Sequence, residues 1–285
     1  MFSDVLRAES FLGATRQYSE ARVVLVGAGL DATVCFRPGT GEGPRAVRYY
    51  SQCIEEYSLR LDRDLREASF CDLGDVLLPA SDTAGALSRI SKVAAGILAD
   101  GKIPGFIGGE HLITGAVLEA VHRVFPEVVV LHFDAHADLR DKYLGERLSH
   151  ATVMRRVIDI LGPGRVYQFG VRSADREEVE FARENTRLFL YKVREPFSAL
   201  RQELDKPVYI TLDLDVVDPG YAPGVGTPET GGISPHELME TVYGFAGLNV
   251  VGFDVVEVNP VCDPGGLAPL LAATVLREIV LLVAG

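Results

Sequence analysis

Short, nearly continuous apolar segments alternate along this chain with longer amphipathic segments, and this alternation restricts the possible folds more than any other feature. The apolar segments are rich in β-branched residues, as expected for strands that are buried on both faces of a parallel sheet. They cover residues 22–27, 102–109, 127–134, 165–171, 207–215 and 249–258. The sequence therefore predicts an α/β fold with a mainly parallel sheet and helices on both of its faces.

The segment 82–101 shows how clearly the helices are marked. Asp82 stands where a helix N-cap is expected, and Gly101 stands where the helix should end. Between them, apolar residues recur at helical spacing. The same pattern predicts further helices at 112–124, 151–161, 235–246 and 268–283.

The 285 residues contain no repeat, low-complexity tract or linker. The Pro- and Gly-rich stretch 218–232 directly follows a predicted strand, so we interpret it as an ordered loop at the sheet edge. Length alone would allow two domains, but this pattern favours a single domain over residues 1–285.

The composition argues against several functions. Acidic residues exceed basic residues by 40 − 28 = 12, so we expect no nucleic-acid or anionic-membrane partner, whereas a cationic substrate is allowed. The N-terminal segment alternates in charge and lacks the apolar core of an export signal, and no apolar run approaches the roughly 20 residues of a membrane span. The four cysteines form no CxxC pair, which favours a reduced, cytoplasmic setting.

Three of the predicted strands end in carboxylates or histidines. The motifs DAHAD at 134–138 and DLD at 213–215 each place polar side chains at alternate positions, and thus on one face of an extended chain. A third motif, GGEH, ends at His111 after two glycines that allow close backbone approach. Ligands of open α/β sheets bind outside the carboxyl ends of the strands, so these side chains should converge. The candidate metal ligands are His111, Asp134, His136, Asp138, Asp213 and Asp215.

Two imidazoles and four carboxylates are more ligands than one divalent ion needs. Without cations the four carboxylates would repel one another and become protonated, whereas two divalent cations keep them ionised. The set therefore predicts a binuclear site. Mixed oxygen and imidazole ligation without thiolate favours Mn²⁺ over Zn²⁺ or Fe.

Two other features receive a structural interpretation. His132 shares the face of Asp134 but lies deeper in its strand, so we interpret it as a core residue or as a support for the ligands. The segment GAGLDA at 27–32 imitates a dinucleotide-binding fingerprint, but a β-prone stretch and a Pro-Gly pair follow it instead of a helix. Nucleotide binding is therefore not expected.

The motifs GGEH, DAHADLR, SHAT, TLDLDVVDP, GTPETGG and FDVVEVNP occur in this order and resemble those of the ureohydrolases, a family that includes arginase and agmatinase. The resemblance spans most of the chain and implies a three-layer α/β/α domain whose mainly parallel sheet has about eight strands. It also implies two Mn²⁺ ions. One would be bound by His111, Asp134, Asp138 and Asp213, and the other by Asp134, His136, Asp213 and Asp215.

The resemblance further implies hydrolysis of a guanidine. His150 resembles the histidine that shuttles a proton to the leaving amine, and Glu257 resembles the glutamate that orients the substrate. A carboxylate can hold a planar guanidinium by two parallel hydrogen bonds. Asp138 is expected to serve the reaction as well as the metals. The implied reaction converts agmatine and water into putrescine and urea, a step of polyamine biosynthesis.

The substrate's tail is less constrained by the sequence. The loop after DAHAD resembles that of short-form bacterial and archaeal agmatinases and lacks the Asn with which arginase holds its amino acid. The acidic residues that could face a terminal ammonium are Asp141, Glu146, Asp175, Glu177 and Glu178. N1-aminopropylagmatine, 4-guanidinobutyrate and arginine remain alternative substrates.

Two other classes of protein fit less well. A metal-dependent deacetylase of related fold would carry one Zn²⁺ and fewer ligands. A non-catalytic metal-binding protein would lack a ligand, His150 or Glu257, and all of these are present. The resemblance finally implies a homo-oligomer, a trimer or a hexamer.

Overall fold

The central feature of the structure, a computed structural model that describes residues 2–285, is one nine-stranded sheet. The strands are β1 (Val5–Leu6), β2 (Val23–Ala28), β5 (Phe70–Val76), β6 (Ile103–Gly108), β7 (Val129–Phe133), β8 (Val166–Val171), β9 (Thr186–Leu190), β10 (Val208–Asp213) and β11 (Val250–Val256). Their spatial order is β1-β5-β2-β6-β11-β10-β7-β8-β9, and only the pair β1–β5 is antiparallel. The predicted α/β fold with a mainly parallel sheet is confirmed.

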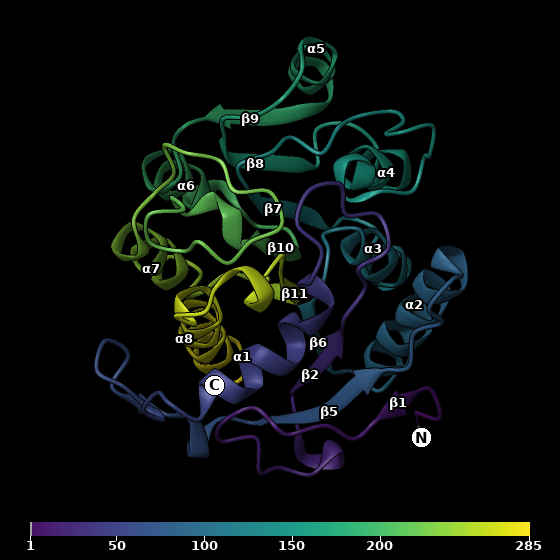
Figure 1. The fold of residues 1–285 in the computed structure, drawn as a ribbon. Helices are drawn as coiled ribbons and strands as arrows, with labels where there is room; N and C mark the ends of the chain where they lie inside the picture. The colour runs from purple at the N-terminus through teal and green to yellow at the C-terminus, as the bar shows by residue number, and fades with distance from the viewer. Residues whose placement is uncertain (1) are drawn as a thin grey trace.

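Helices cover both faces of the sheet and produce three layers (Figure 1). One face carries α2 (Thr83–Ala99), α3 (Ile113–Val124) and α4 (Val153–Leu161). The other carries α1 (Gly43–Ser51), α6 (Arg194–Leu200), α7 (Pro235–Tyr243) and α8 (Leu267–Val283). At one edge of the sheet, α5 (Arg176–Asn185) packs beside β9. Elsewhere, a separate two-stranded hairpin joins β3 (Tyr57–Ser58) to β4 (Arg63–Asp64). An apolar core lies on each side of the sheet.

The boundaries of the predicted helices follow from local capping. Asp82 caps α2 by accepting a hydrogen bond of 2.8 Å from the Gly85 N–H, and Gly101 beyond the helix has a φ of +69°. The helix predicted at 151–161 begins only at Val153, because Ser149 first caps a 3₁₀ turn over His150–Thr152. This turn places His150 beside the carboxyl end of the sheet.

Within residues 2–285, eight helices and strands are not predicted from the sequence: α1, α5, α6, β1, β3, β4, β5 and β9. β5 contains two aspartates and a glycine, which obscure its strand pattern. β9 lies at the sheet edge and is only partly buried, and α1 begins with Gly43 and Pro44, which are typical of loops. Their identity as strand or helix depends on contacts with distant segments.

Arg48 shows how α1 and β5 depend on each other. Its side chain is 1% exposed and forms ion pairs with Asp72, whose Oδ2 lies 2.8 Å from Nε, and with Asp75. Its Nη2 also donates to the carbonyl oxygen of Gly74 at 3.0 Å. A guanidinium buried among these acceptors explains why a strand with two aspartates is stable inside the molecule.

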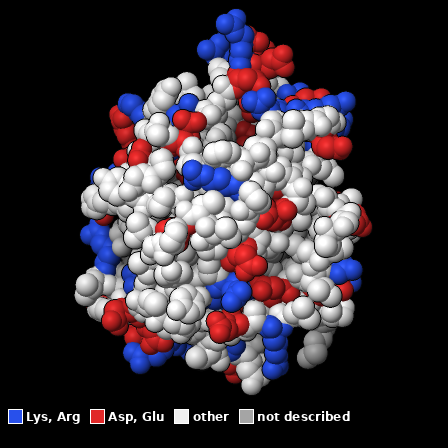
Figure 2. Space-filling model, viewed as in Figure 1, with Lys and Arg blue, Asp and Glu red and all other residues white. Residues whose placement is uncertain are grey.

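On the face drawn in Figure 2, Lys and Arg side chains are scattered among acidic ones. Within residues 2–285, none of the helices is both long and apolar enough to cross a membrane.

We predict that Arg48→Leu lowers the free energy of unfolding by roughly 3–5 kcal/mol, because it leaves the buried Asp72 carboxylate without a partner. Urea denaturation followed by circular dichroism would measure this change. Arg45→Leu is the matched control, since that side chain of the same helix is 83% exposed and should matter little. Equal stability of the two variants would show that the buried ion pair does not hold α1 to β5.

Candidate metal centre and active site

The candidate site residues follow four strands that are neighbours in the sheet, in the order β6-β11-β10-β7. The register aligns the carboxyl ends of these strands: Ile107 pairs with Val255, and Val256 pairs with Asp213. His111 follows β6, the DAHAD motif follows β7, the DLD motif begins at the end of β10, and Glu257 follows β11. The predicted convergence at one edge of the sheet is therefore observed.

The two glycines of GGEH are required by close packing. A Cβ atom on Gly109 would lie 2.0 Å from the carbonyl oxygen of Leu30, and one on Gly108 would lie 2.6 Å from Cγ1 of Val256. The backbone can therefore approach its neighbours and bring His111 into the cluster, as the motif predicts.

Backbone N–H groups orient three of the carboxylates. Oδ1 of Asp134 accepts from the N–H of His136 at 2.6 Å, Oδ1 of Asp213 accepts from that of Asp215 at 2.8 Å, and Oδ1 of Asp215 accepts from that of Ala135 at 2.9 Å. One oxygen of each carboxylate is thus held by a backbone N–H, and the second faces the histidines of the cluster.

Two groups of donor atoms result. In the first, Nδ1 of His111 lies 3.0 Å from Oδ2 of Asp134 and 3.3 Å from Oδ2 of both Asp138 and Asp213. In the second, Nδ1 of His136 lies 2.8 Å from Oδ2 of Asp215 and 3.5 Å from Oδ1 of Asp134. Asp134 belongs to both groups, which is the arrangement that a bridging ligand requires.

Two donor atoms of the cluster are buried without a hydrogen-bond partner, namely Nδ1 of His111 and Oδ2 of Asp215. Native proteins rarely leave buried polar atoms in this state. Both atoms face other donors of oxygen and nitrogen type, so the residues fit a pair of divalent cations.

The charges of the cluster depend on one another. Burial opposes a charge on His111, but Asp134, Asp138 and Asp213 raise the pKa of its imidazole well above the usual range. Burial, together with Asp215 and Asp134, raises the pKa of the Asp213 carboxyl well above the usual range. Against burial, the three surrounding histidines hold the pKa of Asp134 well below it. The metal-free cluster therefore holds protons that bound cations would replace.

A buried chain of hydrogen bonds supports His111 from behind. Nε2 of His111 lies 2.9 Å from Oγ1 of Thr211, and this hydroxyl donates to Oδ1 of Asp254 at 2.6 Å. Tyr209 also donates to Asp254, at 2.6 Å. Because the Thr211 proton is directed to Asp254, Thr211 accepts from Nε2–H of His111, which leaves Nδ1 free as a ligand.

His132 occupies the layer beneath the ligands. Its Nε2 lies 2.8 Å from Oδ2 of Asp134, and its Nδ1 lies 3.0 Å from Nε2 of Gln168. Both ring nitrogens therefore have protein partners. His132 lies close enough to the first group to count among the residues that could hold a metal, so its role as a support for Asp134 stays a prediction.

His150 and Glu257 line the same cleft as the cluster, a cavity of about 190 Å³ that also exposes His111, His136, Asp138 and Asp213. Oε1 of Glu257 accepts from the N–H of His111 at 2.8 Å, and a Cβ atom on Gly226 would lie 2.6 Å from Oε2. The glycine at 226 thus leaves room for the carboxylate.

Two site residues have an unusual backbone conformation, and burial shifts the pKa values of two. Asp138 and Glu257 have φ values of +55° and +66°, a left-handed conformation that is uncommon for residues with a side chain and that clusters at functional sites. Burial raises the pKa of Glu257 well above the usual range and lowers the pKa of His150. His150 is therefore neutral at neutral pH.

The acidic residues proposed for the substrate's tail do not line the cleft as it is formed by the described residues. Glu178 instead accepts from the N–H of Leu139, Asp175 caps α5, and Asp141 pairs with Arg156. Other residues that line the cleft and were not predicted from the sequence include Cys35, Arg140, Tyr143 and Thr227. Arg140 and Tyr143 belong to the same loop as DAHAD, which is the signal that could have identified them.

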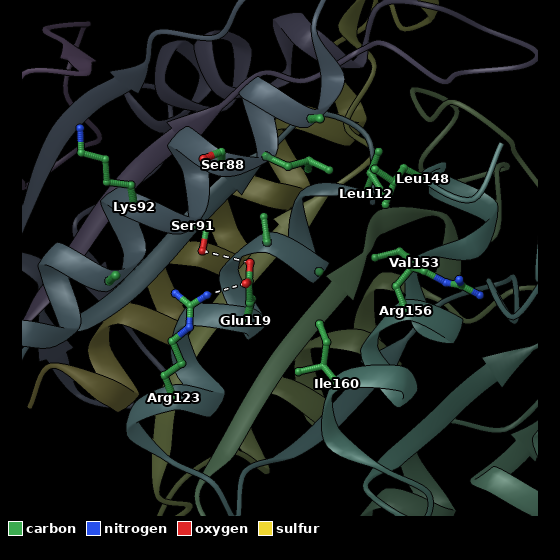
Figure 3. A pocket seen from close by; sticks show the side chains of 15 residues that line it. Ser88, Ser91, Lys92, Leu112, Glu119, Arg123, Leu148, Val153, Arg156 and Ile160 are labelled. Carbon is green, nitrogen blue, oxygen red and sulfur yellow. Dashed lines mark hydrogen bonds and ion pairs between the residues drawn. The ribbon is translucent and has the colours of Figure 1, made fainter.

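A larger hollow of about 610 Å³ lies among α2, α3 and α4, away from the ligand cluster (Figure 3). Its lining is largely apolar, and its polar part includes Glu119, which accepts from Ser91 and pairs with Arg123. None of the candidate ligands lines this hollow, so its greater size does not make it the active site.

The fold and the two-metal donor set define a metal-dependent hydrolase of the arginase type, and the comparisons agree. Residues 21–282 match the arginase family. An agmatinase from Bacillus anthracis is 40% identical over 284 residues, with 98% of each chain covered. A guanidinobutyrase from Pseudomonas aeruginosa is 34% identical, with 91% of this chain and 86% of the relative covered. A solved structure titled as a putative agmatinase from Clostridium difficile has a TM-score of 0.91 and 37% identity, covering 94% of this chain and 99% of that one. The chain belongs to the arginase family.

Asp213→Ala should remove at least one metal ion per chain, because Asp213 contributes to the first group and is expected to bridge. Elemental analysis of purified, metal-loaded protein would measure the stoichiometry. Asp205→Ala, in the loop before β10, is a control outside the cluster that should leave the metal content unchanged. Two metals per chain in Asp213→Ala would contradict the bridging role.

Metal affinity should rise with pH. Because the pKa values of Asp213 and His111 are raised in the metal-free chain, these groups bind protons that a cation must displace. Lowering the pH toward these raised pKa values therefore favours the proton over the metal. Dissociation constants measured by calorimetry at several pH values would test this, and an affinity independent of pH would count against it.

Proposed function

We propose that this protein is a binuclear Mn²⁺ amidinohydrolase that converts agmatine and water into putrescine and urea. The observation that carries the proposal is the convergence of six candidate ligand side chains next to a cleft of about 190 Å³, which four of them line together with His150 and Glu257. The match to the arginase family over residues 21–282 and the identity to agmatinases support it.

Manganese fits the donor set better than the common alternatives. The six proposed ligands are His111, Asp134, His136, Asp138, Asp213 and Asp215, which provide carboxylate oxygen and imidazole nitrogen but no thiolate. Two such cations supply the Lewis acidity that makes water nucleophilic near neutral pH. The guanidine carbon is a poor electrophile, so this activation is needed for attack.

Glu257 provides the anionic partner of the substrate. Its carboxylate lies at the cleft and is anchored by the N–H of His111, so the distance between the guanidinium-binding group and the metal ligand is fixed by the backbone. A carboxylate held in this way can orient a planar guanidinium by charge-assisted hydrogen bonds. Binding of the cation also keeps Glu257 ionised despite its burial.

His150 can move the proton that the reaction requires. Cleavage of the C–N bond releases an amine that must take up a proton, while the attacking water gives one up. His150 is neutral and lines the cleft, so it can accept the proton that the attacking water gives up and donate it to the departing amine.

The relatives suggest two candidates for the tail of the substrate. Agmatine is favoured by the relatives at 40% identity that carry the name agmatinase. The alternative is 4-guanidinobutyrate, which the relative named guanidinobutyrase suggests. Arg140, which lines the cleft, would suit an anionic tail, but Oδ2 of Asp175 lies 2.9 Å from its Nη1 and offsets its charge.

We also propose a cellular location, a domain organisation and an oligomeric state. All four cysteines are free thiols, which supports a reduced, cytoplasmic location. We further propose one domain, since one sheet joins strands from both ends of the chain, and a homo-oligomer of three or six copies, to be measured by light scattering.

Urea release by Mn²⁺-loaded protein tests the substrate. With agmatine, N1-aminopropylagmatine, 4-guanidinobutyrate and arginine at matched concentrations, we expect the highest kcat/KM for agmatine. His150→Ala should lower kcat by about 10²- to 10⁴-fold with the metal content unchanged, as expected for loss of a general acid.

His122→Ala is the matched control, because this histidine lies in α3 and does not line the cleft. If urea appeared only from another guanidine, the proposed reaction would stand and the assigned substrate would change. Full activity of His150→Ala would remove this residue from the mechanism, and no urea from any guanidine despite two bound metals would refute the proposal.

A further inference from the structure

Two polar residues behind His150 have no role in the chemistry described above. Thr33 lies in the segment that follows β2, and Glu110 immediately precedes His111 in the GGEH motif. Glu110 is fully buried, although a glutamate at such a position costs free energy unless it has a partner. The metal ligands alone give no explanation for either residue.

The two residues form a continuous chain of hydrogen bonds with His150. Oε2 of Glu110 accepts from both the backbone N–H and the hydroxyl of Thr33, each at 2.8 Å. Oγ1 of Thr33 in turn accepts from the backbone N–H of His150 at 3.0 Å and lies 3.2 Å from its Nδ1. Three segments that are distant in the sequence thus meet at one hydroxyl group.

The direction of these hydrogen bonds follows from proton counting. A threonine hydroxyl has one proton and two lone pairs. Oε2 of Glu110 already acts as an acceptor for the Thr33 N–H, and at 2.8 Å it lies closer to the hydroxyl than Nδ1 of His150 does at 3.2 Å, so the Thr33 proton points to Glu110. The remaining lone pairs face His150, where they accept from its backbone N–H and from Nδ1–H.

We propose that Thr33 and Glu110 are positioning residues that hold His150 in the tautomer with the proton on Nδ1, so that Nε2 is the nitrogen that exchanges protons in the cleft. Nε2 faces the side of Cys35, a cleft residue whose Sγ lies 3.7 Å away. The N-cap by Ser149 and the ring of Tyr143, 5.6 Å from the imidazole between ring centres, hold the same orientation.

This inference rests on the proposed proton transfer by His150 and specifies the atom. Nε2 takes one proton from the attacking water and gives one proton to the departing amine. The histidine therefore ends each cycle in the protonation state in which it began. A histidine with the opposite tautomer would present N–H to the cleft and could not take the first proton. In hydrolases of other folds, loss of the group that fixes the histidine tautomer is costly for the same reason.

The test compares variants at one position. Thr33→Val has nearly the shape of threonine but no hydroxyl, and it should lower kcat by about 10- to 100-fold with KM and metal content nearly unchanged. Thr33→Ser keeps the hydroxyl and should retain kcat within about threefold. Thr186→Val is the control and should behave as the unaltered protein. It removes a hydroxyl at the start of β9 that donates a hydrogen bond to the carbonyl oxygen of Ala182.

A double variant separates positioning from a general structural effect. If Thr33 acts through His150, Thr33→Val should cause little further loss of kcat in a His150→Ala background. The inference would be overturned if the double variant lost kcat by the product of the two single losses. It would also be overturned if Thr33→Ser were as impaired as Thr33→Val. If Thr33→Val does not fold, Thr33→Ala replaces it in the same cycle.

The outcomes also distinguish this inference from the proposed function. Unaltered protein that releases urea, together with a fully active Thr33→Val, would overturn the role of Thr33 and leave the hydrolase assignment intact. Unaltered protein that releases no urea from any guanidine would refute the proposed function itself.

Discussion

The repulsion among buried carboxylates is the constraint on which the rest of the structure depends. Asp134, Asp213 and Asp215 lie within one cluster and are shielded from water, so their charges cannot be screened by solvent. The chain keeps them together by fixing one oxygen of each with a backbone N–H and by placing histidines between them. Four parallel strands in register supply these groups, and the two helical layers keep the strands in place.

The ligand cluster could be predicted from the sequence because its signals are local. An apolar strand that ends in alternating polar residues, as at Asp134–Asp138, defines both the edge of the sheet and the face on which the side chains lie. The helix at 82–101 is equally local, since its cap and its apolar stripe lie within one segment. The order of the strands is not local, and only the structure shows that β11 and β10 lie between β6 and β7.

The features that the sequence analysis missed depend on partners far away in the chain. β5 is a strand despite Asp72 because Arg48 is buried beside it, and the acidic residues after the DAHAD motif are engaged by backbone groups and arginines instead of the cleft. Burial alone could not assign Glu110, since its carboxylate serves Thr33 from a different segment. Charge in a loop is thus a poor guide to a ligand unless the direction of each side chain is known.

The unpartnered donor atoms Nδ1 of His111 and Oδ2 of Asp215 have a consequence for the whole molecule. They belong to the two different groups of donor atoms, and cations held by these groups would bind the folded chain but find no such arrangement in the unfolded one. Every increase in free metal concentration would therefore shift the folding equilibrium toward the native state. The melting temperature of this protein is therefore not a fixed property of its sequence. It becomes a measure of metal supply, and a cell short of metal would hold a less durable protein before it held a less active one.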